Sequence, residues 1–468
     1  MVVVGAGVSG LATAYYLRTL TTNANLQVTV FEESPRPGGK VQTVQCDGFV
    51  VEAGPDSFFN PKPDAIQLCR AIGLGDQLID SNDEHYETRV WFRGRLWPLP
   101  RGFRMGIPTR IWPFLTTPLL SPFAKARMAL DLVLPARSSE SDESVGAFLS
   151  RRLGREVVER MAGPILGAIY AGDPYQMSAH MILPQLVELE RRHRSLTLGL
   201  QAARRHRGNG HSSAPASVFS TLRPGMAALP ERLAQKLGPD LRLSTRVEFL
   251  APRDGRWQII TNGQAWTADA VVLAVPAQVA AKLVATWSRE AAAELGRFPV
   301  SSSAVVALAF QDADIPELLR RRPVGVVVAL TERAQLLALT WSSAKFAERA
   351  PTGWHLLRAF IGGPLQEELA RRDPTELLNC TLAELRRMLG LHAQPRRVWI
   401  YSWPGANPQM NVGHLDRIAR IERLLSSHPG IFLTGSAFRG IGLADCVRSA
   451  RATAQAVLTY LGQTVQRR

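Results

Sequence analysis

The opening segment, MVVVGAGVSGLATAYYL, constrains the fold more than any other stretch of the sequence. A run of valines predicts a short buried strand, and Gly5, Gly7 and Gly10 follow it in a G-x-G-x-x-G pattern that opens a helix. Gly5 makes the tight turn, Gly7 lets the backbone approach a pyrophosphate, and Gly10 lets the helix pack closely on the strand. The helix N-terminus also presents free N–H groups to the phosphates. The segment therefore predicts a dinucleotide site at Gly5, Ala6, Gly7, Val8, Ser9 and Gly10.

A second predicted strand, QVTVFEES, places two carboxylates where the ribose of a dinucleotide would lie. Glu32 follows Gly10 by about 20 residues, the spacing at which an acidic residue accepts hydrogen bonds from the ribose hydroxyls. Glu33 comes next and is included in the predicted site. A carboxylate at this point disfavours a 2′-phosphate, so the pattern argues against NADP.

Two further glycine segments distinguish FAD from NAD. SPRPGGKVQT supplies a second close backbone approach at Gly38 and Gly39, beside the cation of Lys40. FVVEAGPDSF then predicts a strand followed by a loop of Gly54, Pro55, Asp56 and Ser57. This succession resembles the FAD-binding flavoproteins of the glutathione-reductase and amine-oxidase type. In those proteins the double glycine lies along the dinucleotide and the later loop meets the flavin end.

The C-terminal segment, GIFLTGSAFRGIGLADCVRSARATAQAVLTYL, predicts a strand, a glycine-rich turn and a long amphipathic helix. The turn Gly440, Ile441 and Gly442 would bring backbone N–H groups and the helix N-terminus to the O2/N1 edge of a flavin. Asp445 lies in the first turn of that helix, either as a partner of the helix dipole alone or with an indirect role toward the flavin. Because the FAD site draws on both ends of the chain, we expect a discontinuous nucleotide-binding domain.

The middle of the chain predicts three kinds of structure. Residues 241–283 read as strands separated by the turn signals RDG and NG, and Val247 falls where the superfamily places a strand beside the adenine. Residues 300–360 alternate strand and turn, which predicts an antiparallel substrate-domain sheet. Residues 108–203 are rich in helix formers, and 204–216 form a polar linker.

The helical stretch mixes large apolar side chains with Arg and Lys. This mixture is typical both of shallow membrane docking and of an ordinary helical core, and the two interpretations stay open. The apolar side chains concerned are Trp112, Phe114, Leu115, Leu119, Leu120 and Phe123.

The predicted fold class is mixed α/β, with a discontinuous Rossmann-like FAD-binding domain, an antiparallel-sheet substrate domain and a helical domain open to membrane association. We expect no internal repeats. The FAD-binding domain is predicted at 1–86, 204–285 and 401–468, the substrate domain at 87–107 and 286–400, and the helical domain at 108–203.

The composition limits which binding partners and which cellular compartment we expect. The net charge is +15, but the arginines are scattered over predicted helices, which argues against a nucleic-acid-binding stripe. Four widely spaced cysteines argue against a zinc site or a disulfide framework and suit a reducing cytosol. A strand predicted from residue 2 leaves no room for a signal peptide, and no apolar run reaches the length of a spanning helix. We expect a cytoplasmic protein, with peripheral membrane contact and oligomerisation left open.

Several longer segments resemble one family along almost the whole chain, the protoporphyrinogen/coproporphyrinogen oxidases of haem synthesis. The segments that carry the resemblance are GPDSF at 54–58, SVGAFLSRRLGREVVERMAGPILGAIYAGDP at 144–174, FSTLRPGMAALPERL at 219–233, WPGANPQMNVGH at 403–414 and GIGLADCV at 440–447. IYAGDP is specific to that family, whereas the glycine fingerprint is not. The resemblance implies a six-electron oxidation of a porphyrinogen by non-covalent FAD, with dioxygen as the final acceptor and no dedicated side-chain base or metal.

The resemblance also implies substrate-binding positions. An arginine that pairs with a propionate falls on Arg89, and apolar residues that sandwich the macrocycle fall near Val327, Thr340 and Phe360. Thr340 departs from the larger aliphatic residue usual in the family, which implies a wider or more polar slot. Gly167 and Gly172 lie in the stretch that runs along the substrate cavity, where small residues let a flat ring approach the backbone.

Four other positions complete the expected site. Trp403 is expected along the flavin, and Met410 stands where the family commonly has Tyr. Asp173 and Pro174 are expected to cap and start the helix that follows the break at Gly172.

The resemblance leaves the substrate open between protoporphyrinogen IX, which the sequence favours, and coproporphyrinogen III. Two more distant interpretations stay open as well. One is an amine oxidase or a desaturase of the same superfamily, and the second is a non-catalytic protein like the GDP-dissociation inhibitors, which share the architecture.

Overall fold

A computed structural model describes residues 1–21, 25–83, 86–100, 103–104, 107–108, 112–139, 141–207 and 217–462. The chain divides into two compact units. The first unit comprises Met1–Asp80, Val218–Phe298 and Leu415–Arg468, and the second comprises Ser81–Ser217 and Pro299–His414. The division into six sequence segments stays a prediction.

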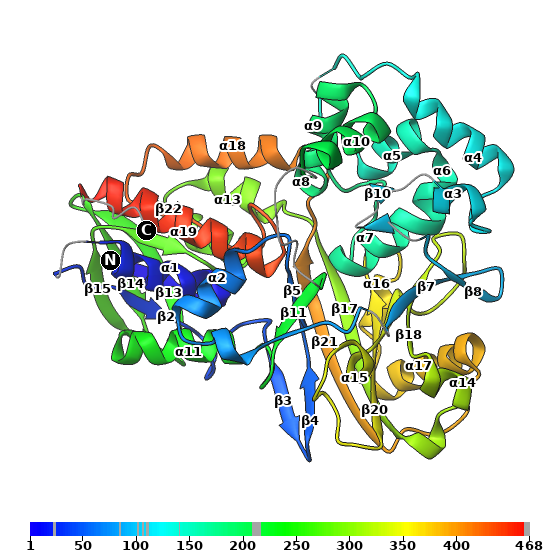
Figure 1. Ribbon diagram of the computed structural model, residues 1–468. Coiled ribbons are helices and arrows are strands. Elements are labelled where there is room, and N and C mark those ends of the chain that lie inside the picture. The colour runs from blue at the N-terminus through cyan, green and yellow to red at the C-terminus, as the bar shows by residue number, and fades with distance from the viewer. Residues whose placement is uncertain are drawn as a thin grey trace. The chain divides into compact units, whose positions relative to one another are not determined.

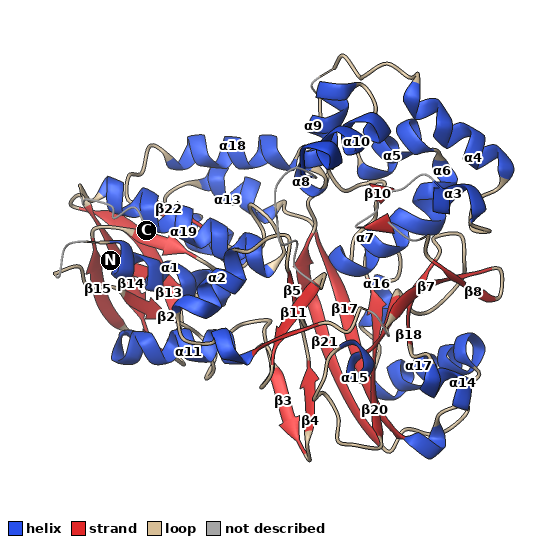
Figure 2. Ribbon diagram, viewed as in Figure 1, coloured by secondary structure: helices blue, strands red, loops and turns tan. Residues whose placement is uncertain are grey.

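The first unit is built on a parallel sheet of five strands in the order β12-β2-β1-β16-β22 (Figures 1 and 2). Its strands are short and buried on both faces, as in other parallel sheets. The bounds are β1 (Val2–Val4), β2 (Thr29–Phe31), β12 (Leu241–Arg242), β16 (Val271–Leu273) and β22 (Ile431–Leu433).

Alternate side chains of this sheet enter two separate cores. Val3, Val30 and Val272 pack with helices on one face, while Val2, Val4 and Val271 pack with a β-sheet and further helices on the other. The first face carries α1 (Val8–Leu20), α2 (Asp64–Ala71), α11 (Ala228–Leu237) and α19 (Leu443–Tyr460). The second face carries β13 (Val247–Arg253), β14 (Arg256–Thr261), β15 (Gln264–Ala268), α12 (Ala277–Val284), α13 (Arg289–Gly296) and α18 (His414–Leu425). This three-layer arrangement brings helices from the two ends of the chain together, and α1 lies beside α19 (Figure 1).

Two small sheets complete the first unit. They pair β3 with β4, and β5 with β11 and β6. The bounds are β3 (Thr43–Cys46), β4 (Phe49–Glu52), β5 (Phe58–Phe59), β6 (Leu78–Asp80) and β11 (Phe219–Leu222).

The second unit contains a seven-stranded sheet in the order β21-β17-β20-β19-β18-β7-β8. The sheet is antiparallel except for the parallel pair of β18 and β7, which the sequence did not indicate. The bounds are β7 (Glu87–Phe92), β8 (Arg95–Pro98), β17 (Val300–Gln311), β18 (Val324–Val328), β19 (Ala338–Trp341), β20 (Trp354–Gly362) and β21 (Arg397–Pro408).

The two faces of this sheet have different neighbours. Trp91, Val326 and Leu357 pack with α17 (Pro374–Leu389), and the shorter helices α14 (Glu317–Arg321), α15 (Ser342–Lys345) and α16 (Glu367–Ala370) also follow strands of this sheet along the chain. Val90 and Val327 pack instead with the helical part of the unit. We call this second face the substrate face, because the predicted substrate residues Val327, Thr340 and Phe360 lie on it.

The helical part consists of short helices broken by glycine and proline. Its members are α3 (Trp112–Thr116), α4 (Pro122–Ala129), α5 (Val145–Leu153), α6 (Arg155–Val157), α7 (Gly163–Tyr170), α8 (Ala179–Ile182), α9 (Pro184–His193) and α10 (Leu196–Arg207). Because α10 reaches Arg207, the first residues of the predicted linker are helical, and 208–216 lie outside the described residues.

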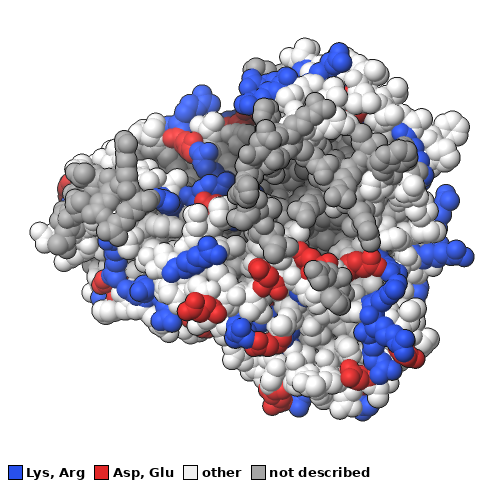
Figure 3. All heavy atoms as spheres, in the orientation of Figure 1, with Lys and Arg blue, Asp and Glu red and all other residues white. Residues whose placement is uncertain are grey.

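The apolar residues considered for membrane docking separate into two groups. Phe114, Leu119 and Leu120 are buried in the helical core, so the core interpretation holds for these three. Phe123 is 88% exposed, and the side chains of Trp112 and Leu115 lie outside the described ones. No helix within the described part of the chain combines the length and apolarity needed to cross a membrane. Lys and Arg side chains occur in several separate groups on the face drawn in Figure 3.

Candidate functional site

The glycine loop connects β1 to α1 in the first unit. Gly5 has φ of +100°, and its N–H donates to the carbonyl oxygen of Phe31 over 2.7 Å. A Cβ on Gly10 would lie 1.9 Å from the carbonyl oxygen of Gly5, so the helix could not pack on the strand with any other residue there. Both glycines are therefore required by the protein itself.

Gly7 has no such internal reason. Its φ of −65° is open to any residue, and a Cβ there would meet no atom within 4 Å. The N-terminus of α1 also has no side-chain cap and no acidic residue in its first turn. Uncapped N–H groups next to open space are suited to a phosphate, so the residues present fit the predicted dinucleotide.

Glu32 closes this loop from the end of β2. Its Oε2 accepts a hydrogen bond from the Ala6 N–H at 2.6 Å, and its Oε1 accepts one from the Ser34 N–H at 2.9 Å. Glu33 is exposed and lies 3.9 Å from Arg246, so the structure brings only the first carboxylate to the glycine loop. Val247 has its side chain in the same core as Phe31 and pairs in the sheet with Thr261, and its contact with adenine stays a prediction.

The second and third glycine segments meet the first. The Gly38 N–H donates to the carbonyl oxygen of Ala6 over 2.8 Å, and a Cβ on Gly39 would lie 3.5 Å from the Gly7 Cα. A Cβ on Gly54 would lie 2.1 Å from the Lys40 carbonyl oxygen. Three separate segments therefore converge, and at Gly54 the backbone contact is one that only glycine allows.

Lys40 is the cation at this convergence. Burial lowers the pKa of Lys40, and the neighbouring thiol of Cys446 acts in the opposite direction. An anionic ligand beside the ammonium group would favour its charged form and offset the cost of burial. In the loop that follows Gly54, the Ser57 hydroxyl donates to Asp56 Oδ1 over 2.7 Å.

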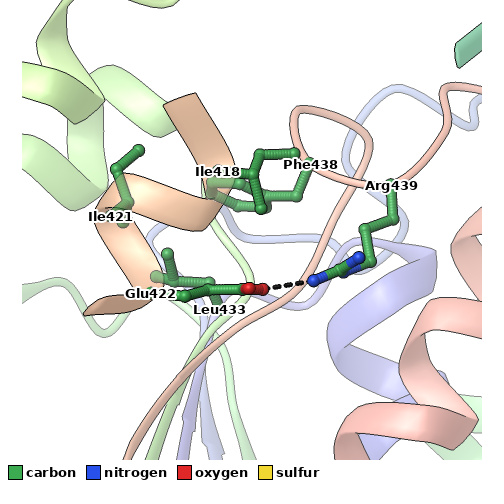
Figure 4. A pocket seen from close by; sticks show the side chains of 6 residues that line it. All are labelled: Ile418, Ile421, Glu422, Leu433, Phe438 and Arg439. Carbon is green, nitrogen blue, oxygen red and sulfur yellow. Dashed lines mark hydrogen bonds and ion pairs between the residues drawn. The ribbon is translucent and has the colours of Figure 1, made fainter. Parts of the chain in front are cut away.

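The C-terminal loop is anchored to α18 just before its glycines. Figure 4 shows Phe438 and Arg439 pointing toward α18, where Arg439 forms an ion pair with Glu422. The Phe438 ring packs edge-on against Phe298 with 5.7 Å between centroids. Gly440 then turns with φ of +133°, and a Cβ there would lie 2.5 Å from the Cβ of Asp445.

The N-terminus of α19 lies next to that of α1. Cys446 is buried, which raises the pKa of its thiol to about 11, and a hydrogen bond with Ser9 acts in the opposite direction. Gly442 provides the N-cap position of α19 without a side-chain cap. Two uncapped helix N-termini and Lys40 thus lie within one region of the first unit.

The substrate face in the second unit carries three of the six predicted substrate residues, Val327, Thr340 and Phe360. Val327 and Phe360 pack with the helical core, and strand register places Thr340 opposite Arg358 on the same face. Trp403 pairs with Ser303 of β17, which the alternation along that strand puts on this face as well. The half-buried Phe360 ring lies 5.0 Å from the guanidinium carbon of Arg358.

Arg89 is not brought together with these residues. It pairs in register with Val326, so it belongs to the face that packs on α17, and its guanidinium group forms an ion pair with Glu87. There it borders a cavity of about 330 Å³ whose lining includes Met388 and Leu389. Its predicted contact with a substrate carboxylate stays a prediction.

The break after α7 differs in detail from the expectation. Asp173 does not cap a helix: its Oδ1 accepts the N–H of Tyr175 at 2.9 Å in a turn, and Ser178 caps α8 instead. The chain first has to reverse in a turn to pair Met177 with Asn411, which delays the helix. Gly172 is enclosed, whereas a Cβ on Gly167 would meet only the Gly172 carbonyl oxygen at 3.5 Å.

Sequence reasoning missed three residues. Lys62 pairs with Asp445, Arg358 is a buried cation on the substrate face, and Gln409 contacts the break after α7. The spacing of Arg358 and Phe360 in a predicted strand could have placed both on one face. The contacts of Lys62 and Gln409 join distant segments, for which the sequence holds no local signal.

Comparison with known proteins gives consistent results. A family model described as flavin containing amine oxidoreductase matches residues 8–458. Coproporphyrinogen III oxidase from Bacillus subtilis (strain 168) is 35% identical, with 98% of each chain covered. Protoporphyrinogen oxidase 1, chloroplastic, from Spinacia oleracea is 28% identical and covers 99% of this chain and 84% of its own. The crystal structure of a protein from Exiguobacterium sp. 255-15 that is named as a protoporphyrinogen oxidase is 34% identical, with a TM-score of 0.86. The match covers 99% of this chain and 98% of that one.

Proposed function

The chain belongs to the family of flavin-containing amine oxidoreductases and is an FAD-dependent oxidoreductase, and we propose that it oxidises coproporphyrinogen III to coproporphyrin III. The observation that carries this choice is the higher identity to a coproporphyrinogen III oxidase, 35%, than to a protoporphyrinogen oxidase, 28%. Protoporphyrinogen IX, which the sequence analysis favours, stays the alternative substrate. A non-catalytic binding protein no longer fits the chain.

The cofactor would be held by the glycine segments of the first unit. Gly7 and the N-terminus of α1 would leave room for the pyrophosphate, and Glu32, whose carboxylate accepts the Ala6 N–H, would contact the ribose. Lys40 and the loop from Gly440 to Gly442 would contact the remaining length of the dinucleotide. Bound non-covalently, FAD would supply the oxidising power for the reaction, with dioxygen as the final acceptor.

The substrate face would supply shape and charge rather than an acid or base. Phe360 and Val327 present apolar surface to a flat macrocycle, and Thr340 leaves more room than a larger aliphatic residue. A porphyrinogen carries carboxylates, so its slot also needs a cation, and Arg358 provides one on this face. These contacts would hold the ring and its carboxylates on the substrate face.

The deciding experiment offers each porphyrinogen separately to the purified holoenzyme in air. Porphyrin fluorescence and peroxide are followed, and we expect a kcat/KM for coproporphyrinogen III at least tenfold above that for protoporphyrinogen IX. A larger value for protoporphyrinogen IX would return the assignment to the other substrate. No rate above autoxidation with either compound would contradict the proposed reaction.

We also propose that part of the helical region contacts an anionic membrane surface. Phe123, Leu130, Leu132 and Val133 are 88%, 47%, 39% and 67% exposed and follow one another along α4 and the turn after it. The chain as a whole carries a net charge of +15. Apolar anchors on a cationic protein suit shallow insertion among anionic headgroups.

A further inference from the structure

Gln409 lies directly after β21 and joins three segments of the second unit. Its side-chain amide nitrogen lies 3.1 Å from the carbonyl oxygen of Ala171, 3.0 Å from the Ser301 hydroxyl and 3.1 Å from the carbonyl oxygen of Asn407. The residue is 4% exposed. Its amide group therefore ties the end of α7 to strands β17 and β21 without access to solvent.

The segment that it holds has an unusual backbone. Ala171 adopts the left-handed conformation with φ of +45°, which residues with a Cβ rarely adopt. Its carbonyl oxygen accepts a second hydrogen bond from the Ser301 hydroxyl at 2.8 Å. A Cβ on Gly363 would come within 3.4 Å of the same peptide group. Such a conformation persists only where the surroundings fix it.

The amide oxygen of Gln409 lowers the stability of this arrangement. Its Oε1 is buried and has no hydrogen-bond partner among the described residues. It faces Gly172, where a Cβ would lie 2.8 Å away. A buried acceptor without a donor lowers stability, which offsets part of what the hydrogen bonds donated by the amide nitrogen contribute.

We propose that Gln409 is a positioning residue that sets the distance between α7 and the substrate face. Leu166 of α7 packs in the same core as Val327 and Ala338, so a shift at the end of α7 changes the width of the slot beside Phe360. This role rests on the proposed function, because the slot is the predicted place of the porphyrinogen. Gln409 would affect how well the substrate fits its slot and would take no part in the reaction itself.

The kinetic test replaces Gln409 by methionine, Q409M, which keeps the length and removes both the nitrogen and the oxygen of the side-chain amide. We expect the KM for the porphyrinogen to rise about tenfold, with kcat changed less than threefold and the affinity for FAD unchanged. A second substitution, A171G, made in Q409M should bring the raised KM back toward the wild-type value, because glycine adopts a positive φ without strain. Q278L is the matched control, since Gln278 also donates to a backbone carbonyl, that of Phe298, over 2.8 Å.

Hydrogen exchange provides a readout that needs no substrate. Peptides covering residues 163–177 should exchange faster in Q409M than in wild type, and should be unchanged in Q278L. If the wild type oxidises no porphyrinogen, the proposed function fails while the exchange measurement still decides the role of Gln409. Unchanged exchange would overturn the proposal, as would a fall in FAD affinity as large as the change in KM. If Q409M does not fold, Q409N, which keeps the amide and shortens the side chain by one methylene group, is measured in its place.

Discussion

Lys62 and Asp445 join the two ends of the chain, since the Lys62 Nζ lies 2.9 Å and 2.8 Å from the two carboxylate oxygens of Asp445. Asp445 stands in the first turn of α19, directly after the predicted flavin loop, and is 13% exposed. It also forms an ion pair with Arg448 in the same helix. The contact connects the segment before α2 to the start of the last helix, so it holds the loop from Gly440 to Gly442 at a defined place within the first unit.

Replacing Lys62 by methionine should weaken FAD binding more than it weakens the fold. Because the pair is partly exposed, we expect a loss of about 0.2–1 kcal/mol in the free energy of unfolding. The dissociation constant for FAD should rise about threefold to tenfold, because the loop loses its link to the segment before α2. Titration of the apoprotein with FAD, followed by flavin fluorescence, measures this change.

The control is R18M, which removes a partly exposed ion pair with Asp240 in the same unit; the side chains of Arg18 and Asp240 are 28% and 48% exposed, against 39% and 13% for Lys62 and Asp445. It should alter stability by a similar amount and leave the FAD dissociation constant at the wild-type value. Equal dissociation constants for K62M and wild type would show that the Lys62–Asp445 contact does not position the flavin loop.

Alanine at two glycines should separate folding from cofactor binding. A Cβ at position 10 would lie 1.9 Å from a backbone oxygen, so G10A should lower the free energy of unfolding of the apoprotein by about 2–4 kcal/mol. A Cβ at position 7 would meet no protein atom within 4 Å, so G7A should leave apoprotein stability within about 0.5 kcal/mol of wild type. Its affinity for FAD should nevertheless fall at least tenfold, because the methyl group occupies the pyrophosphate space. Wild-type FAD affinity in G7A would refute the predicted site.

These residues show how far the sequence could predict the site. Gly5, Gly10 and Glu32 follow from spacing, because their tasks are set by the local geometry of one strand, turn and helix. The face on which Arg89 lies was not predictable, because strand alternation gives two faces but not which of them packs on α17. The pairing of Lys62 with Asp445 depends on tertiary placement across most of the chain.

The four cysteines should fall into two classes of reactivity. Burial raises the pKa of Cys69 to about 12 and that of Cys446 to about 11, so both remain protonated thiols at neutral pH. Iodoacetamide at pH 7.5 should therefore label Cys46 and Cys380, which are partly exposed, and leave the other two unmodified until the protein unfolds. Mass spectrometry of the labelled peptides reads the result, and rapid labelling of native Cys446 would contradict it.

The same two thiols give stability a defined pH dependence. Because their folded-state pKa values lie above the ordinary value of 9.0, their contribution is complete below about pH 9 and is lost as the pH rises toward 11 and 12. Denaturant unfolding of C69S and of wild type at pH 8 and pH 10.5 should show a smaller pH dependence in the variant. An identical dependence in both proteins would exclude this contribution from Cys69.

The exposed apolar residues of α4 and of the turn after it give a prediction for membrane binding. Exchanging Phe123 and Val133 for serine removes the two most exposed anchors of this group, which are 88% and 67% exposed. We expect the fraction bound to phosphatidylserine vesicles to fall severalfold, with activity toward soluble substrate unchanged. L318S is the matched control, because Leu318 is 73% exposed elsewhere in the second unit. Equal vesicle binding by all variants would locate any membrane contact elsewhere.

Two phenylalanines on opposite faces of the seven-stranded sheet should respond differently to the same change. Phe360 lies half-buried on the substrate face, so F360L should lose ring stacking worth about 0.5–1.5 kcal/mol and raise the KM for the porphyrinogen about threefold to tenfold. Phe310 of β17 is fully buried on the α17 face, so F310L should lower the melting temperature and leave KM unchanged. Steady-state kinetics and thermal unfolding of both variants separate the two effects. If F360L lowered the melting temperature without changing KM, Phe360 would be a core residue, and the substrate face would lose its proposed stacking partner.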